Sequence, residues 1–181
     1  MSDDLTGKTY SFDVCVQCKT ICCQDANPPL TRKRQKIISD YLQEQKRSAE
    51  NVFVHAEYSH PTSDSQGYCV FFNKTTGKCS IHQVKPETCK AGPITFDINL
   101  RTRKLEFFLK KAEICAYAQI VYENSAQFKE HLEAAKTEIR RLVSELEADA
   151  LKAILKIEEP QTFKIGEEDL SAGVWEKLGS T

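Results

Sequence analysis

Residues 15–23 read Cys-Val-Gln-Cys-Lys-Thr-Ile-Cys-Cys, which places four cysteines within nine residues. The two-residue gap between Cys15 and Cys18 allows a tight turn with both sulfurs facing one ion, as in zinc knuckles and iron–sulfur loops. Cys22 and Cys23 are adjacent, and adjacent side chains of an extended segment point to opposite sides. This pair therefore favours two centres, or two sides of one cluster, over a single mononuclear site.

Four further cysteines follow, and none occurs after residue 115. Cys69 and Cys79 flank the turn-like segment 73–77, which predicts a short hairpin with one cysteine on each strand. Cys89 lies in a loop bracketed by prolines. Cys115 lies in an apolar stretch, where a small buried thiol is the alternative to a ligand. The predicted metal ligands are Cys15, Cys18, Cys22, Cys23, Cys69, Cys79, Cys89 and Cys115.

Composition and charge narrow the class of protein. The chain has 181 residues with 25 Lys+Arg and 26 Asp+Glu, and a net charge of −1 argues against a polybasic nucleic-acid binder. We expect no nucleic-acid partner, no membrane span and a cytoplasmic location, because no apolar run approaches the ~20 residues of a membrane helix. In a reducing cytoplasm, eight cysteines indicate metal ligation or redox chemistry. A disulfide framework would require export or a hyperthermophilic source.

The middle of the chain predicts short helices and hairpins. Thr31 can cap a helix that runs to about Arg47. Its first turn, Arg32-Lys33-Arg34, opposes the helix dipole, so these cations form either a solvated basic face or a counter-charge for nearby thiolates. Residues 51–67 look irregular. Alternating apolar residues in 94–98 and 105–109 predict a second hairpin with one buried face.

The end of the chain has helical periodicity. Asn124 with Gln127 resembles a capping box, and apolar residues recur every three or four positions from Phe128 to Ile157. This predicts one helix of about 33 residues, ended by Pro160 and roughly 50 Å long. Because such a helix overhangs a small body, we expect a partner helix or a second copy of the chain to bind it through 125–158.

The predicted fold is α+β: a small cysteine-clamped body of short β-hairpins and helices with a long C-terminal α-helix. Two regions are expected, a cysteine-cluster domain over 1–122 and the long helix with a short terminal extension over 123–181. Their charges differ, at +4 and −5. Trp175 is expected to anchor the extension on the body.

The cysteine pattern resembles a known family. Cys15-x2-Cys18-x3-Cys22-Cys23, followed by Cys69-x9-Cys79-Ser-Ile-His-x3-Pro-x2-Cys89, is similar to the CxxCxxCC (YkgJ-like) zinc- or iron-chelating domains. The resemblance covers residues 15 to about 115 and implies that all eight cysteines serve the metal site. This chain departs from the family by one extra residue before Cys22, by His82 in place of Tyr, and by lysines in place of two arginines, at Lys85 and Lys90.

The spacing leaves the metal and the role open. Zinc and an iron–sulfur cluster have equal support, because local Cys-x2-Cys pairs suit zinc while four ligands in one loop suit a cluster. The leading function is a cytoplasmic metal-binding protein with a structural role or a role in relaying metal or electrons. The alternatives are an iron–sulfur oxidoreductase or protein-modifying enzyme, and an interaction module that binds a partner through its tail helix. His82 could be a metal ligand, a donor to a ligand or a hairpin residue, and the last two are favoured, while His131 is expected to face solvent.

Overall fold

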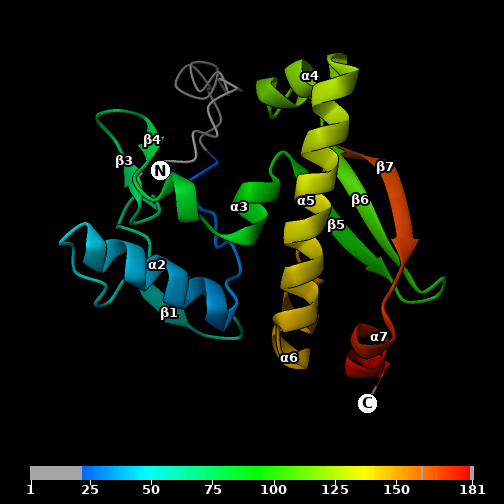
Figure 1. The fold of residues 1–181 in the computed structure, drawn as a ribbon, viewed down its shortest axis with the longest axis horizontal. Coiled ribbons are helices and arrows are strands. Elements are labelled where there is room, and N and C mark those ends of the chain that lie inside the picture. Colours follow the sequence, from blue (N-terminus) through cyan, green and yellow to red (C-terminus); the bar gives the residue numbers. More distant parts are fainter. Residues whose placement is uncertain (1–21, 160, 180–181) are drawn as a thin grey trace, which may run out of the picture.

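A computed structural model describes residues 22–159 and 161–179. Within these ranges the chain forms helices and small antiparallel sheets, which confirms the α+β class (Figure 1). In chain order the elements are α2 (Arg32–Glu44), β1 (Phe53–His55), β2 (Ser59–Pro61), β3 (Phe72–Asn73), β4 (Lys78–Cys79), the 3-10 helix η1 (His82–Val84), α3 (Glu87–Ala91), β5 (Ile94–Asn99), β6 (Lys104–Lys110), α4 (Ala116–Glu123), α5 (Ser125–Glu145), α6 (Ala148–Ile154), β7 (Thr162–Asp169) and α7 (Ala172–Gly179).

Two hydrophobic cores divide the described chain. The N-terminal half (residues 22–86) holds a small core between α2 and the short hairpins. The C-terminal half (residues 87–179) holds a larger core in which α5 packs between α3 and the three-stranded sheet (Figure 1). The small core consists of Leu30, Ile38, Leu42, Val52, Phe71 and Ile81. Residues on both sides of the expected 122/123 boundary contribute to the larger core, including Phe107 and Leu142.

The second predicted hairpin is present. β5 pairs antiparallel with β6 from Ile94↔Leu109 to Asn99↔Lys104. Alternate residues of β6, beginning at Leu105, are buried under α5, as the period of two predicts. β7 adds a third antiparallel strand beside β6, so the terminal extension completes the sheet. Arg103 lies over the ring of Trp175 at 4.3 Å, which holds α7 near the turn between β5 and β6.

The prediction of a single 33-residue helix at the end of the chain is wrong. α5 ends at Glu145, Leu146 is extended, and α6 begins at Ala148. The ammonium of Lys177, on α7, donates hydrogen bonds to the carbonyls of Val143, Ser144 and Leu146, at 3.3, 2.7 and 2.6 Å. A cation at these carbonyls satisfies the end of α5 and complements its dipole. The helix therefore stops 15 residues before Pro160.

The apolar stripe of this helix is covered by the chain itself. Ala135, Ile139 and Leu142 are at most 1% exposed, and Val143 and Leu146 are at most 5% exposed. The overhang of a 50 Å helix was the reason to expect a partner through 125–158, and that overhang is absent. Self-association stays a prediction, now without an exposed stripe to support it.

Lys177→Met tests the role of the Lys177 cap. Burial lowers the pKa of Lys177, and its hydrogen bonds to three carbonyls offset that cost. Because hydrogen bonds to a charged group contribute about 1.5–3 kcal/mol, the variant should lose roughly that much free energy of unfolding in urea. Lys129→Met, at an exposed position of α5, should change stability by less than about 0.5 kcal/mol. Equal stability of the two variants would contradict the cap.

The basic first turn of α2 is divided: Arg32 and Lys33 have 92% and 67% of their side-chain surface exposed and form the predicted solvated face, whereas Arg34 is buried. Arg34 is 4% exposed, and its guanidinium donates to Glu138 on α5 at 2.6 Å. Lys33 and Arg32 lie 3.9 and 4.0 Å from Glu145 and Glu147. The basic body thus pairs with the acidic tail, and the ion pairs join the two halves of the molecule.

Two local expectations are also wrong. Residues 51–67 include the hairpin β1–β2, in which Phe53 pairs with Pro61 and His55 with Ser59. His131 is 8% exposed, and its Nε2 lies 3.2 and 3.1 Å from the carbonyl oxygens of Ala91 and Gly92. Its place on an otherwise polar turn of the helix gave no signal of this contact. None of the helices within 22–159 and 161–179 has the length and apolar character of a membrane span.

Candidate metal centre

Backbone pairing brings the Cys22-Cys23 segment beside Cys69. The amide of Cys69 donates to the carbonyl of Cys23 at 2.8 Å, and the amide of Asp25 donates to the carbonyl of Gly67 at 2.8 Å. An isolated antiparallel bridge joins Gln24 and Tyr68 between these bonds. Two parts of the sequence more than forty residues apart are thereby placed side by side, and each carries a cysteine.

Gly67 permits this close approach. Its φ is +81°, a left-handed conformation that glycine adopts at no steric cost. A Cβ at this position would lie 2.0 Å from Oδ1 of Asp25, far inside contact distance. The glycine is therefore required where the segment that carries Cys22 and Cys23 meets the segment that carries Cys69.

The predicted hairpin is present but very short, and only Cys79 lies on one of its strands, because Cys69 precedes β3 and forms an isolated bridge with Ser63 instead. β3 and β4 have two residues each, and Phe72 pairs with Cys79. The side chain of Asn73 accepts hydrogen bonds from the amides of Thr75 and Thr76, at 2.9 and 3.0 Å, and so closes the turn. Cys69 and Cys79 pack against the small core of the N-terminal half.

Cys89 lies on a helix rather than in the predicted loop. Pro86 is the N-cap of α3, which runs from Glu87 to Ala91. A proline at the start of a helix is well tolerated, because its missing amide would have no partner there and its φ suits the first turn. The two prolines around Cys89 therefore bracket one helical turn, and the neighbours Glu87 and Lys90 contact other elements.

Cys22 and Cys23 differ strongly in acidity. The Cys23 thiol donates a hydrogen bond to the Cys22 sulfur, which lowers the pKa of Cys22 to about 6, with smaller contributions from the positive charges of Lys110 and Lys85. The same hydrogen bond, together with burial, raises the pKa of Cys23. Cys22 is thus the more acidic thiol of the pair, and the residue is partly exposed to solvent.

Cys69, Cys79 and Cys89 are the other described cysteines of the N-terminal region, and charges on several of the five shift the pKa of others. Burial raises the pKa of all three thiols, that of Cys89 to about 12. The negative charges of Cys22, Cys79 and Cys69 also contribute to the pKa of Cys89, and that of Cys89 contributes to the pKa of Cys23. These five thiols, which come from four separate segments, form no disulfides with one another.

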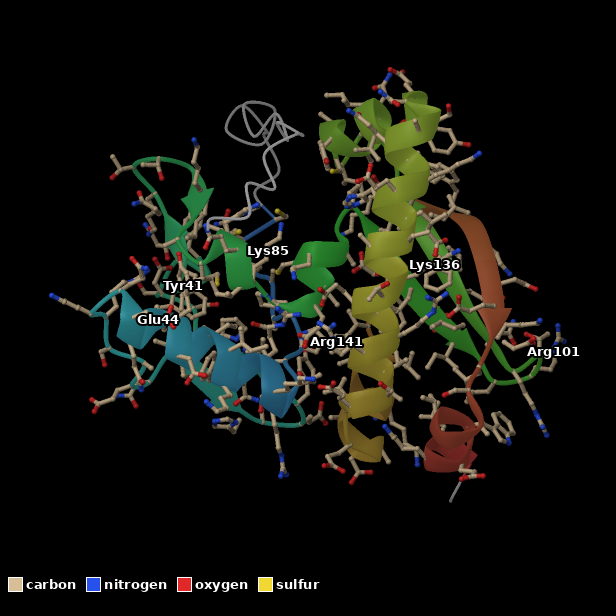
Figure 2. The ribbon with its side chains drawn as sticks, in the orientation of Figure 1. Tyr41, Glu44, Lys85, Arg101, Lys136 and Arg141 are labelled. Carbon is tan, nitrogen blue, oxygen red and sulfur yellow. The ribbon has the colours of Figure 1, made fainter. Side chains whose placement is uncertain are left out.

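The donor set fits a metal centre. Thiolates are the soft ligands that zinc and iron–sulfur clusters prefer, and metal binding deprotonates buried thiols of this kind. Lys85, between η1 and α3 (Figure 2), lowers the pKa of Cys22, Cys79 and Cys89 through its positive charge. Among the described residues, no three His, Cys, Asp or Glu side chains are arranged to hold an ion. Cys15 and Cys18 lie outside the described residues.

Cys115 and His82 occupy different settings. Cys115 is the N-cap residue of α4 and packs against the larger core of the C-terminal half. His82 opens η1, three residues after Cys79, and burial together with the charge of Lys85 lowers the pKa of His82.

Charged residues near the cysteines were not predictable as parts of the site. Lys85 stands in the sequence as a departure from the family pattern, and the structure shows that its charge lowers the pKa of Cys89. Glu87 is 0% exposed beside Cys89, and its partner Arg34 comes from α2. No pattern in the sequence connects those two positions.

Comparison with known proteins also supports metal binding by this region. Residues 14–116 match the model of the CxxCxxCC family, described as a "putative zinc- or iron-chelating domain". Neither the curated proteins nor the solved structures gave a match. The matched segment contains all eight cysteines. Because the family model covers more than half of the chain, the protein belongs to the CxxCxxCC family of zinc- or iron-chelating domains.

Proposed function

We propose that the protein holds zinc or an iron–sulfur cluster through its eight cysteines, and that this centre folds the N-terminal half. The observation that carries the proposal is that backbone pairing places the Cys22-Cys23 segment beside Cys69, which packs with Cys79 against the small core. Cys89 follows on α3. Cys15 and Cys18 precede Cys22 in the sequence by a few residues, so the same centre is within their reach. Cys115 would contribute a ligand to the same centre from the start of α4.

The size of the surrounding core supports a structural role. In the described part of the N-terminal half the hydrophobic core has only six buried residues, and the strands have two or three residues each. Small domains with so little buried apolar surface usually need disulfides or metals for stability. Family membership supports metal chelation, and a metal held by thiolates would supply the missing free energy.

A relay role is a second candidate, favoured by the exposure of Cys22. A solvent-accessible cysteine with a lowered pKa is a position from which a metal or an electron could be exchanged with a partner. A structural centre and a relay centre differ in lability: a structural zinc should exchange slowly, whereas a relay centre should exchange metal or change redox state readily.

Anaerobic purification followed by elemental analysis and a visible spectrum tests the proposal and separates the two metals. Zinc is colourless, whereas an iron–sulfur cluster absorbs visible light and releases sulfide in acid. We expect one of these two results. A protein with neither bound metal nor acid-labile sulfide, also after reconstitution, would contradict the proposed function.

Single Cys→Ser variants should rank the ligands. A hydroxyl is a poor substitute for a soft thiolate, so we expect clear loss of bound metal for Cys15, Cys18, Cys22, Cys23, Cys79 and Cys89. Cys115→Ser should have the mildest effect, because Cys115 packs against the apolar core of the other half. Metal content per chain is the measurement. Full metal content in all eight variants would overturn the cysteine site.

A further inference from the structure

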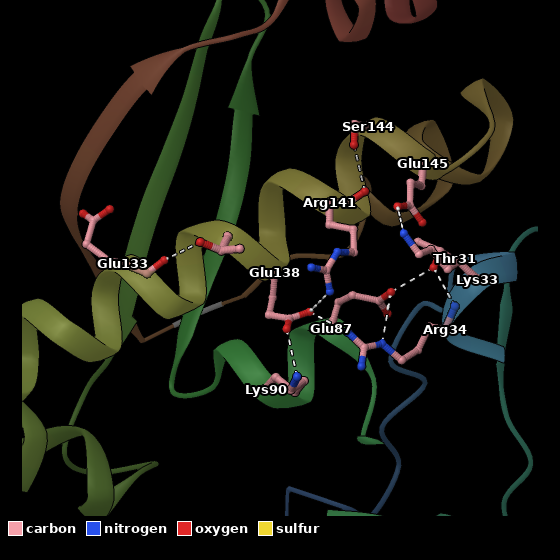
Figure 3. A network of polar contacts seen from close by, with 11 residues as sticks. Thr31, Lys33, Arg34, Glu87, Lys90, Glu133, Glu138, Arg141, Ser144 and Glu145 are labelled. Carbon is pink, nitrogen blue, oxygen red and sulfur yellow. Dashed lines mark hydrogen bonds and ion pairs between the residues drawn. The ribbon is translucent and has the colours of Figure 1, made fainter. Parts of the chain in front are cut away.

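α3 carries Cys89 but is too short to fix its own position. It has five residues, and an isolated helix of that length is unstable in water. Ala91 packs into the larger core with 0% exposure. The residues around Cys89, Glu87 and Lys90, are held by side chains from two other helices (Figure 3).

Glu138, on α5, contacts both of the helices that approach it. One carboxylate oxygen accepts from Lys90 of α3 at 2.9 Å. The other accepts from Arg34 of α2 at 2.6 Å and from Arg141 of α5 at 3.2 Å (Figure 3). The side chain of Glu138 is 12% exposed and that of Arg34 is 4% exposed. Charge-assisted hydrogen bonds with this little exposure are stronger and more restrictive than surface ion pairs.

Glu87 fixes the other end of α3 to α2. Its Oε1 accepts from the hydroxyl of Thr31 at 2.9 Å and lies 3.4 Å from Nε of Arg34. Arg34 therefore bridges Glu87 and Glu138, and α3 is held at both sides of Cys89. Glu138 is the one carboxylate of this network that contacts α2, α3 and α5 together, within the described residues.

We propose that Glu138 is a positioning residue for Cys89: by binding Lys90 and Arg34 it sets the position of α3, and thus of the Cys89 thiolate, relative to the other cysteines. The inference rests on the proposed function, in which Cys89 is a metal ligand. Metal affinity then depends on a carboxylate of the C-terminal half, although no cysteine lies on that helix. By linkage, metal binding strengthens the contact between α3 and α5 by the same factor.

Co²⁺ titration of the reconstituted full chain tests this role, because the intensity of its visible bands reports tetrahedral thiolate coordination. Glu138→Gln keeps the shape of the side chain and removes its charge. We expect the variant to bind Co²⁺ about tenfold more weakly, the lower end of what outer-sphere substitutions cost, with altered band intensity. Lys90→Met should weaken binding similarly. Because Glu138 acts through Lys90, the double variant should lose less than the product of the two single effects.

Glu168→Gln is the matched control. Glu168 binds Arg140 of the same helix α5 through two hydrogen bonds, the one from Nε at 2.7 Å, but it lies on β7 and away from α3. We expect its Co²⁺ affinity to stay within about twofold of wild type. Equal affinities of the Glu138→Gln and Glu168→Gln variants, with wild type binding Co²⁺, would overturn the positioning role alone.

Two further outcomes of the Co²⁺ titration would also decide between the proposed function and the positioning role. If the wild-type chain binds no Co²⁺ or Zn²⁺ and holds no iron–sulfur cluster, the proposed function fails and the positioning role falls with it. If Glu138→Gln does not fold, Lys90→Met carries the test, because Lys90 is 33% exposed and its replacement leaves the buried Arg34–Glu138 pair in place. Unchanged Co²⁺ affinity and spectrum in Lys90→Met would then contradict the role.

Discussion

Removal of the bound metal is expected to unfold the N-terminal half while the C-terminal half stays folded. The described chain buries six apolar residues in the small core and sixteen in the large one. Structural zinc supplies about 10–16 kcal/mol in small metal domains, more than the stability of many whole domains. The N-terminal half should therefore lose its native packing when the metal is chelated, because its own core cannot replace that contribution.

Hydrogen exchange of the loaded and chelated protein measures this difference. Amides of α2 and of the Cys69–Cys23 contact should lose protection, whereas those of β6 and the middle of α5 should retain it. The single tryptophan, Trp175, lies against Arg103 in the C-terminal half, so its fluorescence should change little. Unchanged protection in both halves after complete metal removal would show that the centre has no structural role.

The Leu142→Asp substitution is expected to unfold the C-terminal half. Leu142 is 0% exposed in the larger core, where α5 meets the sheet. The change removes a buried leucine, which costs about 2–5 kcal/mol even for alanine, and adds the cost of burying a carboxylate. The free energy of unfolding should fall by more than about 5 kcal/mol, and the variant should be largely unfolded at 25 °C.

Ala134→Asp is the control for this substitution, since Ala134 is exposed on the same helix. Its cost should be below about 1 kcal/mol, the difference in helix propensity. Urea unfolding followed by circular dichroism measures both variants. If Leu142→Asp were instead a stable folded monomer while the wild type formed dimers, the stripe of 125–158 would be an interface between chains, as the sequence analysis expected.

The parts of the fold that depend on near neighbours were predictable. Thr31 is the N-cap of α2 and accepts from the amide of Arg34, and Asn124 caps α5 in the same way. The β5–β6 hairpin was predictable because apolar and polar residues alternate along both strands, and a short turn connects them. In each case the deciding interaction joins residues a few positions apart, so the sequence pattern contains it.

The end of the tail helix was not predictable from its own residues. Periodicity continues past Glu145, and no glycine or proline marks the stop. At the end of α5 the last carbonyls bind Lys177, more than thirty residues later in the chain, which follows β7 of the sheet. Likewise, His131 is buried because α3 places the Ala91 and Gly92 carbonyls beside it.

For the site, the sequence by itself determined the family: the cysteine pattern of residues 14–116 matches the zinc- or iron-chelating CxxCxxCC domains. The tertiary structure decided which thiols meet, because the Cys23–Cys69 and Asp25–Gly67 contacts join segments that no local rule connects. It also decided the acidity of Cys22, through its hydrogen bond from Cys23 and the charges of Lys110 and Lys85. Side-chain type follows from sequence, whereas burial and through-space charge exist only once distant segments have packed together.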